Sequence, residues 1–231
     1  KSNIMGFYRG PNIVTDGLVF AVDAGSGRSY DGTTTVNNLA GSNTATLYNG
    51  VTYLSINGGV WDFDGTDDYA GLPNSAIPTG NQITMSFWTE IDNVQNSSII
   101  AGTAGSFVQN LNIHLPWGDG NVYFDCGNGV GATSRIVFTP TTAEKTGWHN
   151  WVFTKNASTG IMKIYLDGTE KSSGSGRTST IPALTTVTLG RFFTNNYYNN
   201  GKIANTLIYS TALTSTEILQ NFNAQKSRFG L

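Results

Sequence analysis

The sequence predicts an all-β protein, built as a two-sheet antiparallel β-sandwich with one short C-terminal helix. Charged residues make up 12% of the 231-residue chain, about half of the usual share of roughly 25%. Glycine is abundant at 28 residues, and threonine, asparagine and aromatic residues add to a composition that suits short strands and tight turns. Short segments that alternate between apolar and polar residues follow one another with turn residues between them, as in a sandwich.

The clearest strand covers residues 83–91, where Ile83, Met85 and Phe87 share one face and Ser86 lies on the other. Such alternation with a period of two is typical of a half-buried strand. The same criterion predicts strands at 18–22, 60–63, 99–102, 122–126, 136–139, 148–155, 162–166, 187–190 and 203–209. We find no linker or internal repeat that would divide the chain.

Two local signals refine this picture. Asp167-Gly168 follows the strand 162–166, and this dipeptide favours a type I′ hairpin turn. Thr214 and Glu217 have the spacing of a capping box at a helix start. We therefore expect one domain over residues 1–231, with an N-terminal arm (1–16) and a C-terminal helix and tail (213–231) packing on it.

Charge and composition exclude several classes of function. The net charge is −2 and basic residues are scattered, so we expect no nucleic-acid partner. No apolar run approaches the ~20 residues that span a bilayer, so we expect no membrane partner. Cys126 is the single cysteine, which excludes an internal disulfide framework, and we expect it to be a small core residue.

Six segments, taken together and in order, resemble the concanavalin A-like lectin/glucanase superfamily in its laminin-G-like jelly-roll branch. They are residues 17–25 (GLVFAVDAG), 57–69 (NGGVWDFDGTDDY), 83–88 (ITMSFW), 148–153 (WHNWVF), 164–168 (IYLDG) and 207–219 (LIYSTALTSTEIL). The resemblance covers almost the whole chain. It implies a jelly-roll sandwich and a binding or structural role.

A narrower resemblance lies in two flanking segments, residues 9–18 (RGPNIVTDGL) and 221–230 (NFNAQKSRFG). They are similar to domains of virion proteins from tailed marine or cyanobacterial bacteriophages, which are head decorations, fibres or tail appendages. The resemblance implies location in a virion that is assembled in the host cytoplasm, self-association, and other virion proteins as partners. Virion subunits fold in a reducing cytoplasm, which agrees with the lack of a disulfide framework.

The superfamily also includes glucanases, which need catalytic carboxylates. Laminarinase-type members carry two glutamates on one strand, as E-x-D-x-E or E-x-D-x-x-E. Glu90-Ile91-Asp92 matches the first half, but Asn93-Val94-Gln95 follows, and the second glutamate is missing. A retaining glycosidase needs two carboxylates. We therefore expect a protein that is not an enzyme.

Related domains often hold a calcium ion, and Asp64, Asp67 and Asp68 are candidate ligands for it because calcium prefers oxygen ligands. The alternative is an ordinary turn in which aspartate side chains accept hydrogen bonds from backbone N–H groups. The sequence favours the turn, since calcium takes 6–8 ligands and the cluster offers few. No other cofactor is expected.

Two loops carry the mixture of aromatic, amide and carboxylate side chains that sugar sites use. The candidate glycan- or partner-binding residues are Trp117, Asp119 and Asn121 in one loop and Asn196, Tyr197, Tyr198 and Asn199 in the other. An equal alternative is that Trp117 covers the sandwich edge and the tyrosines contact a neighbouring subunit.

Two functions from different classes therefore remain. The first is a non-enzymatic virion structural protein with a lectin-like fold, which also binds host or environmental glycans. The second is a stand-alone carbohydrate-binding module of a cell-surface or secreted protein.

Overall fold

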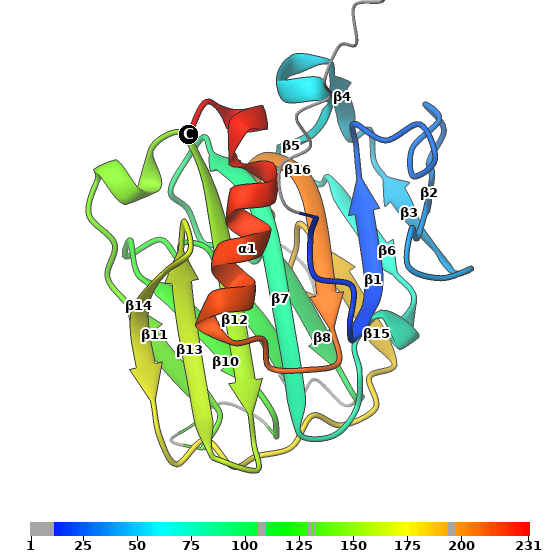
Figure 1. Cartoon of the computed structure of the whole chain (residues 1–231). Helices are drawn as coiled ribbons and strands as arrows, with labels where there is room; N and C mark the ends of the chain where they lie inside the picture. Colours follow the sequence, from blue (N-terminus) through cyan, green and yellow to red (C-terminus); the bar gives the residue numbers. More distant parts are fainter. Residues whose placement is uncertain (1–11, 106–109, 129–130, 132, 194–196) are drawn as a thin grey trace, which may run out of the picture.

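The computed structural model describes residues 12–105, 110–128, 131, 133–193 and 197–231, and it confirms a sandwich of two antiparallel sheets (Figure 1). Sheet A contains, in spatial order, β14 (Thr169–Gly174), β13 (Ile161–Leu166), β12 (Trp148–Asn156), β7 (Gln82–Ile91), β16 (Asn200–Tyr209), β5 (Val60–Asp64) and β4 (Thr52–Leu54), and β1 (Leu18–Asp23) also pairs with β16. Sheet B contains β11 (Arg135–Phe138), β10 (Val122–Cys126), β9 (Leu111–His114), β8 (Ile100–Thr103), β15 (Thr186–Leu189), β6 (Tyr69–Leu72), β3 (Thr44–Tyr48) and β2 (Thr35–Asn37).

The helices are few and short. One α-helix, α1 (Ser215–Gln225), lies in front of sheet A in Figure 1, and Ile218 packs there with Val152 and Leu207. Among the residues that the structure describes, there are also four short 3₁₀ helices: η1 (Ile56–Gly58), η2 (Asn74–Ala76), η3 (Ala143–Lys145) and η4 (Lys226–Phe229). In the described part of the chain, no helix is long and apolar enough to cross a membrane.

The main core lies between the two sheets. Ile83, Met85 and Phe87 of β7 point into it and are fully buried, which confirms the core face predicted for this strand. The strand is not half-buried as predicted, because its opposite face is also buried, as at Trp88. Cys126 is buried in the same core, and burial raises the pKa of its thiol to about 12. The thiol is therefore protonated and unreactive at neutral pH.

Both local signals are confirmed. Asp167 and Gly168 have φ of 50° and 77°, as a type I′ turn requires. The Thr214 hydroxyl accepts from the Glu217 N–H while the Glu217 carboxylate accepts from the Thr214 N–H.

Several strands were missed or placed wrongly. The strands β2, β3, β4, β6 and β9 were not predicted. β2 and β4 are only three residues long, too short to show a period, and β6 contains Gly71, a residue type that is depleted in strands. β16 begins at Asn200 and not at residue 203, and Asn200 and Gly201 pair with Asp64 and Phe63 of β5. The asparagine-rich composition of that segment had indicated a loop.

The residues after α1 pack on the outer face of sheet A. The Phe229 ring stacks on Trp88, with 4.1 Å between centroids, and contacts Trp148. Arg228 donates two hydrogen bonds to the Asp23 carboxylate, at 2.8 and 2.9 Å, and others to the carbonyls of Asn57 and Gly59. This segment therefore joins α1 to β1 and to the turn before β5.

His149 is held at the start of β12 by hydrogen bonds from both ring nitrogens. Nδ1 lies 2.7 Å from the Asp167 carboxylate, and Nε2 lies 3.2 Å from the carbonyls of Ala143 and Thr146. Because all of these partners are acceptors, they favour the doubly protonated ring. The bond with Asp167 raises the pKa of His149 above its ordinary value.

We expect this pKa shift to make stability depend on pH. A raised pKa in the folded state means that the contribution is complete below pH ~6.5 and is lost as pH rises through the folded-state pKa. His149→Gln should therefore cost about 2 kcal/mol below pH 6 and less at pH 8. Urea unfolding of both proteins from pH 5 to pH 8 measures this difference, and a difference that is constant with pH would contradict the assignment.

Candidate functional site

A hollow of about 280 Å³ opens at the outer face of sheet B, where β9 ends and β10 begins. Its lining residues are His114, Trp117, Asp119, Tyr123 and Arg135. Two of them, Trp117 and Asp119, were predicted as binding residues. The other three come from β9, β10 and β11, at positions where alternation turns the side chain away from the core.

The structure brings the two predicted loops together. The rings of Trp117 and Tyr197 meet edge to face with 4.9 Å between their centroids. Phe192 lies 5.8 Å from Tyr197 and 6.5 Å from the His114 ring. An aromatic cluster from segments about 80 residues apart in the sequence therefore borders the hollow.

The polar side of the hollow is formed by Asp119 and Tyr123. The Tyr123 hydroxyl donates to Asp119 Oδ2 at 2.7 Å, and the Asn121 N–H donates to Oδ1 at 2.9 Å. These bonds, with that from Asn121 the larger, lower the pKa of Asp119, while the bond to Asp119 raises the pKa of Tyr123. At neutral pH the hollow thus presents an ionised carboxylate and a neutral phenol.

His114 forms the base of the hollow as a neutral ring. Its Nδ1 donates to the Ser97 carbonyl at 2.6 Å, and its Nε2 accepts from the Asn112 amide at 2.6 Å. This assignment follows from the partners, because a carbonyl can only accept. Burial lowers the pKa of His114, so the ring carries no charge at neutral pH.

Arg135 is the positively charged residue of the hollow, and the buried carboxylate of Asp125 fixes its position. Its guanidinium donates two hydrogen bonds to the Asp125 carboxylate, at 2.6 and 2.7 Å. Asp125 is fully buried, whereas the Arg135 side chain is 31% exposed. The guanidinium also lies 4.9 Å from the centre of the Tyr123 ring, so the pair fixes the orientation of Tyr123 as well.

The other predicted binding residues are Asn121, Asn196, Tyr198 and Asn199. Asn121 lies beside the hollow, where its Oδ1 accepts from the Thr139 hydroxyl at 2.6 Å. The Tyr198 carbonyl accepts from Gln95. Asn199 was a wrong prediction, since it is 4% exposed and its N–H donates to Gly190. Asn196 lies outside the described residues.

Glu90 and Asp92, which match the first half of the glucanase motif, both have Lys202 as a partner. Lys202 Nζ lies 2.5 Å from the Asp92 carboxylate and 3.7 Å from that of Glu90. Glu90 in β7 and Asp92 just after it therefore share one ammonium group from the neighbouring strand β16. Glu90 thus has a positively charged partner near the end of β7.

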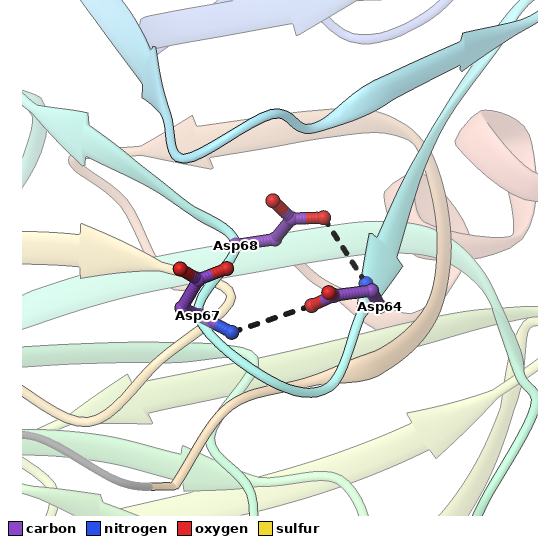
Figure 2. A group of neighbouring side chains, drawn as sticks. All are labelled: Asp64, Asp67 and Asp68. Atoms are coloured by element: carbon purple, nitrogen blue, oxygen red, sulfur yellow. Dashed lines mark hydrogen bonds between the residues drawn. The ribbon is translucent and has the colours of Figure 1, made fainter.

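Figure 2 shows the three candidate calcium ligands around the turn between β5 and β6. The carboxylate oxygens of Asp64, Asp67 and Asp68 lie within 4.8 Å of one another. Asp64 Oδ1 accepts from the N–H groups of Thr66 and Asp67, and Asp68 Oδ2 accepts from that of Asp64.

Amide side chains already occupy the backbone oxygens of this turn. Asn200, Gln95 and Asn49 donate to the carbonyls of residues 64, 65 and 67, respectively. Calcium draws on backbone carbonyls as well as carboxylates, so these bonds leave it few ligands. The geometry is that of a hydrogen-bonded turn.

We expect calcium to change the stability of the protein little. Because a ligand stabilises the folded state only if it binds there, 1 mM calcium should shift the Tm by less than about 1 °C. Asp64→Ala should cost about 1 kcal/mol through the lost turn bonds, equally with calcium and with a chelator. A saturable rise in Tm that Asp64→Ala abolishes would instead assign a calcium site.

Comparison with known proteins agrees with this architecture. A family model described as the concanavalin A-like lectin/glucanases superfamily matches residues 64–219. Comparison with curated protein sequences gives no match.

Solved structures that resemble the chain include domain 4 of AbnA, a GH43 extracellular arabinanase from Geobacillus stearothermophilus, in complex with arabinotriose. The TM-score is 0.69 at 16% identity, and the match covers 89% of this chain and 98% of that chain. The binding domain of botulinum neurotoxin DC, in complex with rat synaptotagmin II, gives 0.70 at 16% identity, with 92% of this chain and 52% of that chain covered.

A third similar structure is the Trypanosoma rangeli sialidase in complex with the inhibitor DANA, with a TM-score of 0.68 at 16% identity. That match covers 94% of this chain and 34% of the sialidase. The chain thus spans about half of the toxin domain and a third of the sialidase. At such identities, the likeness shows the fold.

Proposed function

The chain belongs to the concanavalin A-like lectin/glucanase superfamily, and on this basis we propose that it is a non-enzymatic carbohydrate-binding protein whose site is the hollow around Trp117. The observation that carries the proposal is the meeting of Trp117 and Tyr197 beside Asp119. An aromatic wall next to a few fixed polar groups is what a sugar ring requires.

Each lining group has a role in such a site. The half-buried Trp117 ring offers a face to the C–H bonds of a sugar. Asp119, held ionised, accepts hydrogen bonds from sugar hydroxyls, and Arg135 donates them. Because Asp125 and Asn112 hold Arg135 and His114 from below, the site is preorganised and little ordering entropy is lost on binding.

Similar structures support the proposal at the level of the fold. The arabinanase domain was solved with arabinotriose, and the botulinum neurotoxin domain is a binding domain. The non-enzymatic part of the proposal rests on Glu90, which has Lys202 as its partner and no second glutamate on its strand. Turnover of a β-glucan that Glu90→Gln abolishes would overturn it.

We expect Trp117→Ala to weaken glycan binding about 30-fold, or about 2 kcal/mol. A glycan array identifies the ligand, and calorimetry with wild type and variant measures the change. Tyr48→Ala is the matched control, since Tyr48 is a 42% exposed tyrosine on the same sheet but outside the hollow, and it should bind as wild type does. An array without signal, with and without calcium, would refute the proposal.

A second candidate is a structural role in a phage virion. It is supported by the two phage-like flanking segments, which contact each other: the Val14 N–H donates to Asn221 Oδ1 at 2.7 Å. This role implies self-association or docking to other virion proteins, and it is compatible with glycan binding. Light scattering with and without calcium should give a discrete dimer or trimer, and a monomer that does not sediment with virions would exclude this role.

A further inference from the structure

A second hollow lies away from Trp117. It measures about 550 Å³, and it is formed by the loop after β1 and by β4. Its lining residues are Ala24, Gly25, Gly27, Tyr30, Asp31, Gly32 and Tyr53. None of them lines the Trp117 hollow.

Two tyrosine rings form its wall. Tyr53 is 43% exposed, and its ring centroid lies 5.4 Å from that of Tyr30 with the planes inclined by 36°. Tyr30 in turn meets the buried Trp61 edge to face at 5.6 Å. Because the core fixes Tyr30, the wall exists before any ligand arrives.

A carboxylate lies next to the rings. Asp31 Oδ1 accepts hydrogen bonds from the Thr33 N–H at 3.1 Å and from its hydroxyl at 2.7 Å, and these bonds lower the pKa of Asp31. Within the described residues, Oδ2 accepts no hydrogen bond. The hollow thus presents an ionised acceptor beside two tyrosine rings.

Glycines keep the hollow open. A Cβ at Gly27 or Gly32 would meet nothing within 4 Å, so a side chain at either position would extend into open space. Gly25 is different, because its Cβ would lie 2.3 Å from the Gly58 carbonyl oxygen. Gly27 has no positive φ and lines the hollow, so we expect a larger residue at this position to fit the backbone and to occupy part of the hollow.

We propose that this hollow is a second sugar-binding site, in which a sugar ring stacks on Tyr53 and its hydroxyls donate to Asp31. The proposal rests on the proposed function, since it assigns the same ligand class to a separate place on the molecule. Two weak sites on one chain raise the apparent affinity for a branched or repetitive glycan, because the second contact is intramolecular.

The test is the number of sugars bound per chain. Calorimetry with arabinotriose, and with the trisaccharide that gives the strongest array signal, should give two per wild-type chain. Trp117→Ala and Tyr53→Ala should each leave one, and the double variant none. Gly27→Trp should act like Tyr53→Ala without removing a wall residue, and circular dichroism verifies that each variant is folded.

The outcomes separate the two proposals. One sugar per chain, lost in Trp117→Ala and kept in Tyr53→Ala and Gly27→Trp, would overturn the second site and leave the proposed function intact. One sugar that is lost in Tyr53→Ala and kept in Trp117→Ala would overturn the site at Trp117 and leave the site at Tyr53 intact. Binding of neither trisaccharide would overturn both. Tyrosine rings beside a carboxylate can also recognise a quaternary ammonium ion, and tetramethylammonium is the probe for that class of ligand. Its binding at Tyr53 in place of sugar would overturn the second site.

Discussion

Phe229→Ala should lower the free energy of unfolding by about 3–5 kcal/mol, the usual cost of removing a buried aromatic ring. Phe229 is 9% exposed and packs between Trp88 and Trp148 on the outer face of sheet A. Alanine would leave a cavity beside Trp88 and loosen Arg228, which binds Asp23 from the adjacent position. Urea unfolding followed by tryptophan fluorescence measures the loss.

The matched control is Leu231→Ala. Leu231 lies two residues further along and is 51% exposed, so its truncation should change stability by less than about 0.5 kcal/mol. Equal effects of the two substitutions would mean that the segment does not pack on sheet A in solution.

Arg135→Ala should cost about 3–5 kcal/mol, because it removes the bidentate partner of a carboxylate that has no contact with water. Asp125 is fully buried, and both of its oxygens accept from Arg135. The same substitution removes a donor from the Trp117 hollow, so sugar binding should weaken together with stability.

Lys163→Ala provides the comparison for this pair. Lys163 and Glu170 form an ion pair in which both side chains are more than a third exposed, at 34% and 40%. Surface pairs contribute about 0–1 kcal/mol, so this variant should unfold almost as wild type does. If Arg135→Ala cost no more than Lys163→Ala, the Asp125–Arg135 pair would not contribute to the fold as we infer.

The sequence predicted those parts of the fold in which a local pattern decides the structure. The core face of residues 83–91, the turn at Asp167-Gly168 and the capping box at Thr214 each depend on neighbours within a few residues. All three are confirmed, and so is the family. The short strands β2 and β4 could not be predicted, since three residues show no period.

Contacts between distant residues were beyond local patterns. Trp117 and Tyr197 were predicted for separate loops, and nothing in the sequence indicated that their rings meet. Lys155 is another example: a lysine suggests a solvent-exposed position, yet it is fully buried, and its ammonium donates to the Cys126 carbonyl. Burial lowers the pKa of Lys155, and no sequence pattern predicts this burial.

The position of β16 has a consequence for how the protein is made. Among the described strands it is the last along the chain, yet it lies in the middle of sheet A between β7 and β5 and also pairs with β1, the first. During synthesis, which proceeds from the N-terminus, sheet A therefore remains divided until residues 200–209 have left the ribosome. Before then, β1, β5 and β7 each lack β16 as the partner of one edge, and an unpaired edge is a template for pairing with another chain.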